Sequence, residues 1–178
     1  MTFLYTSRLR LEPLLTAHAD RLFVLFQDPA LYAFISRTVP TDLSEFRKGI
    51  EFLEGRTSYD GKEHWLNWVS FTQDTGEIVG KIEITIEKDM GVAYLAYTTF
   101  RKFWGQGYAK EACAEVIRHV LDDWKTTKIV IEMDVRNMAS VRLAESLGAK
   151  RVAFKPKAQM LKGEWSDEYR YELAEARR

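Results

Sequence analysis

The sequence predicts a mixed α/β (α+β) fold in which strands precede, separate and follow the helices. Apolar and polar residues alternate over 81–87, which is the period of a strand with one buried face. Over 108–124 the apolar residues instead recur at helical spacing and form a single stripe. No linker, repeat or low-complexity tract divides the 178 residues, so we expect a single domain spanning 1–178.

The first half of the chain is expected to hold two helices and most of the strands. Thr16 is placed to cap the first helix, and Pro29 is expected to stop it. A turn at 74–76 separates two strand-like segments and so predicts an antiparallel hairpin. In chain order the expected elements are a strand at 9–14, a helix between Thr16 and Pro29, a helix at 43–56, and strands at 65–72, 78–87 and 92–98.

The second half alternates helix and strand and ends on two strands. Gly148 suits the left-handed position that follows a helix. Gly163 lies in a loop expected to join the last two strands. The expected elements are a helix at 108–124, a strand at 128–135, a helix at 140–147, and strands at 151–154 and 165–173.

Composition excludes several classes of protein. The 26 basic and 26 acidic residues give no excess of positive charge, which argues against general nucleic-acid binding. Cys113 is alone, so neither an internal disulfide nor a cysteine-based zinc site is expected. The first eight residues lack the apolar stretch of a signal peptide, and no run reaches a membrane span. We therefore expect a cytoplasmic protein that uses no metal and does not bind membranes.

A short glycine turn between a strand and the long helix is the main candidate site. Gly105 and Gly107 allow backbone amides to approach a ligand closely, and the helix that follows presents unpaired N–H groups. Arg101, Lys102 and Lys110 add positive charge, so a diphosphate is the expected ligand. Lys110 occupies the position of the third small residue of the Rossmann pattern, and no Walker motif is present. A tight turn without any ligand remains the alternative.

A second segment, 137–149, follows a strand one helix further on. Together with the glycine turn it resembles the GNAT superfamily of acyl-CoA-dependent N-acyltransferases, and more narrowly the RimJ/RimL branch, whose members acetylate N-terminal amines of ribosomal proteins. The resemblance extends to 7–13, 76–80 and 167–173. It implies a mixed, mostly antiparallel central sheet, flanked by helices on both faces and with splayed central strands.

The resemblance also implies where coenzyme A binds. The pyrophosphate pattern of the family falls on Trp104, Gly105, Gln106, Gly107, Tyr108 and Ala109, with backbone amides from Lys102 onward holding the pyrophosphate. Trp104 stands where the family has Gln or Arg, so Arg101 or Lys102 is expected to supply that charge. The preceding strand is expected to hold the pantetheine arm and the developing oxyanion through main-chain groups of Ala96, Tyr97, Thr98 and Thr99. Asn137 is expected to bond the pantetheine arm or, alternatively, to cap a helix.

The catalytic groups are less clearly marked. The tyrosine that many relatives use as the acid is replaced by Ala144. Ser140, one turn earlier, resembles the serine of RimL-like enzymes and is expected either to protonate the thiolate or only to cap the helix. Candidate bases are Glu83, Glu132 and Asp134, although water chains or a substrate amine of low pKa are alternatives.

The sequence therefore favours an acetyl-CoA-dependent N-acetyltransferase that acts by direct transfer in a ternary complex. The acceptor is a primary amine, either a protein N-terminus or a small molecule. Two rivals are a non-catalytic acyl-CoA-binding or sensing module and a nucleotide-binding protein. The oligomeric state is not defined by the sequence, and a homodimer would be the commonest oligomer.

Overall fold

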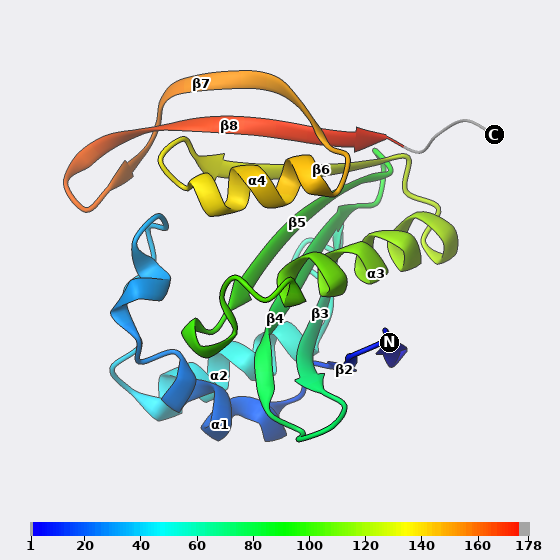
Figure 1. Ribbon diagram of the computed structural model, residues 1–178, viewed down its shortest axis with the longest axis vertical. Helices are drawn as coiled ribbons and strands as arrows, with labels where there is room; N and C mark the ends of the chain where they lie inside the picture. The colour runs from blue at the N-terminus through cyan, green and yellow to red at the C-terminus, as the bar shows by residue number, and fades with distance from the viewer. Residues whose placement is uncertain (1, 175–178) are drawn as a thin grey trace.

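The computed structural model describes residues 2–174 and contains one eight-stranded sheet in the order β1-β2-β3-β4-β5-β6-β8-β7 (Figure 1). Every neighbouring pair is antiparallel except β5 and β6, which are parallel. The mixed, mostly antiparallel sheet predicted from the sequence is thus confirmed. The strands are β1 (Leu4–Tyr5), β2 (Leu9–Pro13), β3 (Glu63–Thr72), β4 (Ile78–Glu87), β5 (Val92–Thr99), β6 (Lys128–Asp134), β7 (Lys150–Leu161) and β8 (Glu164–Ala174).

Helices cover both faces of this sheet. On β3, Trp65 contacts Phe52 of α2, whereas Trp68 contacts His119 of α3. Because residues an odd number apart on a strand point to opposite faces, α2 and α3 lie on opposite sides of the sheet. The helices are α1 (Ala19–Leu25), α2 (Leu43–Glu54), α3 (Tyr108–Asp123) and α4 (Met138–Ser146), with short 3₁₀ turns at Thr16–His18, Pro29–Tyr32 and Arg101–Phe103.

The two parallel strands separate in the middle of the sheet. β5 pairs with β6 only from Val92 to Tyr94, while its pairing with β4 continues to Thr99. β6 in turn continues along β8 as far as Asp134. Beyond Tyr94 the facing edges of β5 and β6 are therefore unpaired, and the splayed central strands expected from the family resemblance are present.

Gly80 of β4 lies against the backbone of β5 so closely that it leaves no room for a side chain. A Cβ atom at this position would lie 2.1 Å from the carbonyl oxygen of Thr98 on β5. No side chain fits there, so a glycine is required for β5 to reach the splay point in its observed register. Within the segment 76–80, the glycine at position 80 is thus explained by its contact with β5.

Two expectations about local structure are wrong. Thr16 does not cap α1: its hydroxyl donates to Glu54 at 2.6 Å, and His18 occupies the N-cap position without a side-chain bond. The loop expected between the last two strands is part of β7, which runs on to Leu161. Gly163, on which the expected loop rested, lies in the short turn between β7 and β8. Pro156 is tolerated inside β7 because β7 is an edge strand whose pairing shifts between Lys155 and Gln159.

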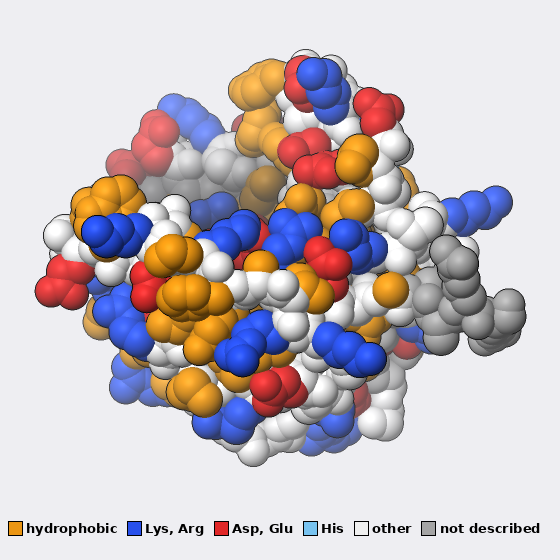
Figure 2. All heavy atoms as spheres, turned by 90° about the horizontal axis from the view of Figure 1, so that it is seen from above, with side chains coloured by type: hydrophobic (Ala, Val, Ile, Leu, Met, Phe, Trp, Pro, Cys, Tyr) orange, Lys and Arg blue, Asp and Glu red, His pale blue; other side chains and the backbone are white. Residues whose placement is uncertain are grey.

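The edge formed by β7 and β8 presents a mixed surface. Seen from above, Lys and Arg side chains lie next to Asp and Glu side chains, with hydrophobic groups between them (Figure 2). Val152 and Phe154 of β7 and Trp165 of β8 are among the exposed hydrophobic residues. Within residues 2–174 no helix is both long and apolar enough to cross a membrane.

Candidate active site

The glycine turn sits at the N-terminus of α3, as the sequence predicts. Gly105 and Gly107 have φ angles of 71° and 80°, in the left-handed region that favours glycine, and Gly107 is the N-cap of α3. Glu111 is the first residue whose N–H bonds back along the helix, to the carbonyl of Gly107. Among residues 2–174 no acceptor bonds the N–H groups from Gly105 to Lys110. Successive unpaired donors at a helix N-terminus are the arrangement that binds anions in many proteins.

Side chains fix the carbonyl groups of this turn. The Trp104 indole donates to the carbonyl of Thr99 at 2.6 Å, and the Gln106 amide donates to the carbonyl of Lys102 at 2.7 Å. The Trp104 bond connects the turn to the end of β5, and the Gln106 bond connects it to the 3₁₀ turn just before it. The sequence marks these two residues only as parts of a pattern, whereas the structure gives their side chains a role in holding the turn's shape.

The two cations expected to assist the anion are engaged elsewhere. Arg101 makes a two-pronged bond to Asp28, with both N–O distances 2.8 Å, and this hydrogen bonding lowers the pKa of Asp28. Lys102 is bonded to Glu77. Both cations are therefore paired with carboxylates in this structure, and the expectation that one of them supplies the charge of the missing Gln or Arg stays a prediction. Lys110 is exposed in the first turn of α3.

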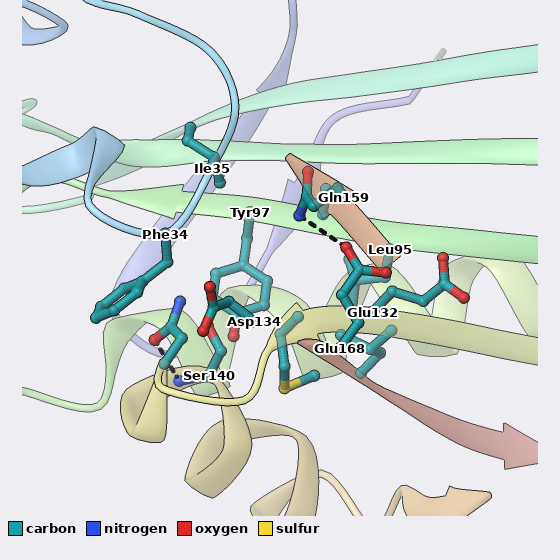
Figure 3. A pocket seen from close by; sticks show the side chains of 13 residues that line it. Phe34, Ile35, Leu95, Tyr97, Glu132, Asp134, Ser140, Gln159 and Glu168 are labelled. Atoms are coloured by element: carbon teal, nitrogen blue, oxygen red, sulfur yellow. Dashed lines mark hydrogen bonds between the residues drawn. The ribbon is translucent and has the colours of Figure 1, made fainter. Parts of the chain in front are cut away.

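A pocket lies where β5 and β6 separate, next to the turn after β6 (Figure 3). Its wall combines apolar side chains from the loop before α2 with polar groups from β5, β6, β7 and β8. The lining residues are Phe34, Ile35, Leu95, Ala96, Tyr97, Ile131, Glu132, Met133, Asp134, Asn137, Ser140, Gln159 and Glu168. The structure therefore gathers Ala96, Tyr97, Asn137, Ser140 and Asp134 at one site, whereas Thr98 and Thr99 continue β5 toward the glycine turn.

Asn137 and Ser140 meet at the start of α4. The Asn137 side-chain oxygen accepts the backbone N–H of Ser140 at 3.1 Å, so Asn137 is the N-cap of the helix. The capping alternative is thus what the structure contains. Capping uses only the amide oxygen, and a bond from the amide nitrogen to a pantetheine arm stays a prediction.

The hydroxyl of Tyr97 was not among the groups expected to do chemistry. Its oxygen is enclosed, and among residues 2–174 it has no hydrogen-bond partner. Burial raises the pKa of Tyr97, while the neighbouring Ser140 hydroxyl acts in the opposite direction. Figure 3 shows the Tyr97 ring directed from β5 toward Ser140. The sequence alone assigned only the main chain of Tyr97 to the coenzyme. The alternation of side chains along β5 could have indicated on which face of the sheet its hydroxyl lies.

Asp134 is unsuited to the base role expected for it. Its side chain is 0% exposed and bonded to Arg136 at 2.6 Å and to Ser166 at 2.6 Å. Hydrogen bonding to Arg136 lowers the pKa of Asp134 to about 2, against the effect of burial. A carboxylate with this pKa accepts almost no protons at neutral pH, so the structure contradicts this assignment.

The other two candidate bases are also held by cations. Glu83 accepts a bond from the buried Lys81 at 3.0 Å. Burial opposes the charge of Glu83, but Lys81 and Arg37 lower its pKa below the usual value. Glu83 does not line the pocket, whereas Glu132 does but lies 2.5 Å from Lys155. Each of these two carboxylates is thus already paired with a lysine.

Glu168 of β8 is the pocket carboxylate that the sequence did not single out. It accepts a bond from the Gln159 amide at 2.7 Å, and the structure gives it no ion pair among residues 2–174. Burial raises the pKa of Glu168, as do the nearby charges of Glu132 and Asp134. On a strand with one polar face, nothing in the sequence separates Glu168 from its solvated neighbours; only the register of β8 against β6 brings it to the pocket.

Nothing in the described part of the chain forms a metal centre: no group of three or more His, Cys, Asp or Glu side chains is arranged to hold an ion.

Comparisons with known proteins identify the family. Residues 8–150 match the Acetyltransferase (GNAT) domain. The uncharacterized N-acetyltransferase p20 of Bacillus licheniformis is 26% identical over 174 residues, covering 97% of this chain and 96% of that protein. An FsC-acetyl coenzyme A-N(2)-transacetylase of Aspergillus fumigatus is 28% identical over 158 residues, covering 84% of this chain and 65% of that protein.

Among solved structures, RimL, a ribosomal L7/L12 alpha-N-protein acetyltransferase in complex with coenzyme A, superposes with a TM-score of 0.86. The superposition covers 97% of this chain and 98% of RimL at 22% sequence identity, so the two share a fold. The family match spans most of the chain, including the glycine turn and α4. The chain therefore belongs to the GNAT acetyltransferase family, whose members are acetyl-CoA-dependent acyltransferases.

Proposed function

We propose that this chain is an N-acetyltransferase that transfers the acetyl group of acetyl-CoA to a primary amine within a ternary complex. One observation carries the proposal: the free amides of the glycine turn and the unpaired edge of β5 lead into one pocket that also holds Ser140 and Glu168. The amides of the glycine turn suit a diphosphate, and the pocket suits an acyl group together with its amine acceptor.

The residues present are suited to coenzyme A. The N–H groups from Gly105 to Lys110 are unpaired donors at the positive end of α3, which is what a diphosphate requires. Past Tyr94, alternate N–H and C=O groups of β5 face the gap rather than a neighbouring strand. These groups are available to bond the amides of a pantetheine arm. Acetyl-CoA supplies an activated acyl group bonded through a thioester.

Residues of the chain supply orientation and proton transfer. A β5 N–H group facing the gap stabilises negative charge on the acyl oxygen. Glu168 accepts the proton that an ammonium group must lose before it can attack, and its raised pKa favours that step. Ser140 donates toward the departing sulfur, and the enclosed Tyr97 hydroxyl is placed to bond the Ser140 oxygen as it does so.

The pocket favours an amine acceptor. Glu168 presents negative charge to a cationic group, and Phe34 and Ile35 provide an apolar wall on the other side. RimL acts on a protein α-amino group, and the Aspergillus relative is named for transfer to an N(2) nitrogen. These names support a primary amine, with a protein N-terminus and a small amine as the two candidate classes.

Thiol-release assays with acetyl-CoA test this function. The acceptor panel contains peptides with free N-termini, amino acids, polyamines and aminoglycosides, and mass spectrometry locates the added acetyl group. The proposal predicts release of coenzyme A with at least one class and a product acetylated on nitrogen. Protection of the chain by acetyl-CoA against heat, without thiol release across the panel, would favour the rival non-catalytic acyl-CoA-binding module. The cytoplasmic location and the homodimer expected from the sequence stay predictions.

A further inference from the structure

Three residues near the start of the chain and one residue of α3, about a hundred positions later, form a hydrogen-bonded cluster beside the glycine turn. The Glu111 carboxylate in the first turn of α3 accepts bonds from the hydroxyls of Thr6 and Ser7 and from the backbone N–H of Arg8 at 2.9 Å. Its second oxygen pairs with the Arg8 side chain at 2.6 Å. We call Thr6, Ser7, Arg8 and Glu111 the N-terminal clasp.

The clasp reaches the glycine turn through Arg8. Its guanidinium lies 4.2 Å from the centre of the Tyr108 ring and donates from Nη1 to the carbonyl of Gln106 at 3.1 Å. A Cβ atom on Gly107 would lie 3.5 Å from Nη2 of the same group. Arg8 therefore packs directly against the peptide that joins Gln106 to Gly107.

This bond sets the direction of an amide. The peptide bonds are trans, and in a trans peptide the C=O and N–H groups point to opposite sides of the chain. When Arg8 holds the Gln106 carbonyl on its side, the N–H of Gly107 is turned to the other side. Gly107, with a φ of 80°, restricts the orientation of this peptide less than any other residue would. Arg8 thus keeps a free donor aimed away from the clasp.

The clasp acts by orientation more than by added charge. Glu111 neutralises Arg8, and although burial disfavours the charged form of Glu111, the bonds from Thr6, Arg8 and Ser7 lower its pKa below the usual value. An ion pair contributes little net field to a diphosphate. A lysine at position 8 would keep the charge but lacks the planar fork that bonds Glu111 and Gln106 together.

We propose that Arg8, held by Glu111, is a positioning residue for diphosphate binding, because it locks the Gln106–Gly107 peptide with its N–H toward the anion. The inference rests on the proposed binding of coenzyme A at the glycine turn. The segment 7–13 resembles the family in sequence, but the sequence alone assigned it no role. This inference gives it a part in binding the coenzyme.

Calorimetric affinities of the wild type and of Arg8→Lys, Arg8→Gln and Glu111→Gln test this role. The ligands are coenzyme A, dephospho-coenzyme A, which keeps the diphosphate, and pantetheine, which lacks it. We expect each variant to bind both diphosphate ligands about tenfold more weakly and pantetheine with unchanged affinity. The matched control is Arg10→Lys, because Arg10 pairs with Glu12 of the same strand, β2, and has a similar exposure, 39% against 44% for Arg8.

Each other outcome has a distinct meaning. Unchanged affinity of Arg8→Lys for coenzyme A, while the wild type binds it, overturns the positioning role and leaves the proposed function intact. An equal loss for pantetheine overturns it as well, because the effect is then general damage. A loss for coenzyme A but not for dephospho-coenzyme A also overturns it, because Arg8 then acts on the 3′-phosphate. No binding by the wild type would refute the proposed function itself.

Discussion

Asp134 and Glu168 lie directly opposite each other in the β6–β8 register, yet their carboxyl groups have opposite acidities. Bonding to Arg136 lowers the pKa of Asp134 to about 2, whereas burial and the charges of Glu132 and Asp134 raise that of Glu168. Pairs of carboxyl groups driven apart in this way are typical of active sites. Asp134 is held by Arg136 and Ser166, and Glu168 is the carboxyl group that we propose for proton transfer.

Replacing Glu168 by Gln should lower kcat by about a hundredfold or more, because the group that removes the ammonium proton is lost. In the wild type, kcat should rise with pH through the pKa of Glu168, at a pH above the ordinary carboxyl value of 4.5. That acid limb should vanish in Glu168→Gln. Steady-state kinetics from pH 5 to 9 measure both effects.

Glu132→Gln is the matched control for this prediction, since Glu132 lines the same pocket but pairs with Lys155. It should keep most of the activity and the acid limb. A Glu168→Gln enzyme with wild-type kcat and pH profile would remove Glu168 from the mechanism.

Replacing Asp134 by Asn should destabilise the fold in a pH-dependent way. The pKa of Asp134 is lowered on folding from 3.8 to about 2, so its charge adds about 2 kcal/mol to the free energy of unfolding. This contribution is present above pH 4 and is lost as the pH falls toward 2. Urea unfolding should therefore show a gap between wild type and variant at pH 7 that narrows at pH 3. A gap independent of pH would show that the charge of Asp134 is not its source.

Replacing Ser140 by Ala should lower kcat by about tenfold or more while the KM for acetyl-CoA changes little, because the hydroxyl acts on the departing sulfur. Tyr97→Phe should give a smaller loss of the same kind. Ser146→Ala is the control: it lies on the same helix, and its exposed hydroxyl bonds the carbonyl of Leu143. Loss of affinity rather than of turnover would assign Ser140 to binding.

Replacing Gly80 by Ala should cost about 1–3 kcal/mol of stability, because the new Cβ would overlap the Thr98 carbonyl and push β5 away. The expected displacement would also raise the KM for acetyl-CoA. Gly49→Ala in α2 is the opposite control, since nothing lies within 4 Å and alanine favours a helix by about 0.5–1 kcal/mol. Thermal unfolding compares the two, and equal stability of Gly80→Ala and wild type would contradict the account of this strand.

Local sequence patterns predicted the parts of the site that depend on neighbouring residues. The two glycines with a helix after them gave the turn, and Asn137 ahead of an apolar stripe gave the start of α4. Contacts made across long sequence separations had no such pattern. Arg8 meets Glu111 over a separation of 103 residues, and Glu168 reaches the pocket only through strand register.

Charge partners are the part of the site that the sequence did not predict. Arg101 and Lys102 were expected to supply the charge of the missing Gln or Arg, and the structure pairs them with Asp28 and Glu77 from other parts of the fold. Asp134 was expected to be a base because it ends a strand near the cleft; its close partner Arg136 removes it from that role. Asp28 and Glu77 are brought to their partners by tertiary structure, whereas Arg136 is a sequence neighbour whose bond to Asp134 depends on the local turn after β6.

The central claim is that the amides of the glycine turn bind the diphosphate of coenzyme A. Titration of the ¹⁵N-labelled chain with coenzyme A, followed by amide NMR, tests it most directly. The account predicts that the largest and saturable shifts fall on the N–H groups from Gly105 to Lys110, with smaller ones along β5. Saturable binding whose largest shifts lie elsewhere, with those six amides unmoved, would contradict it.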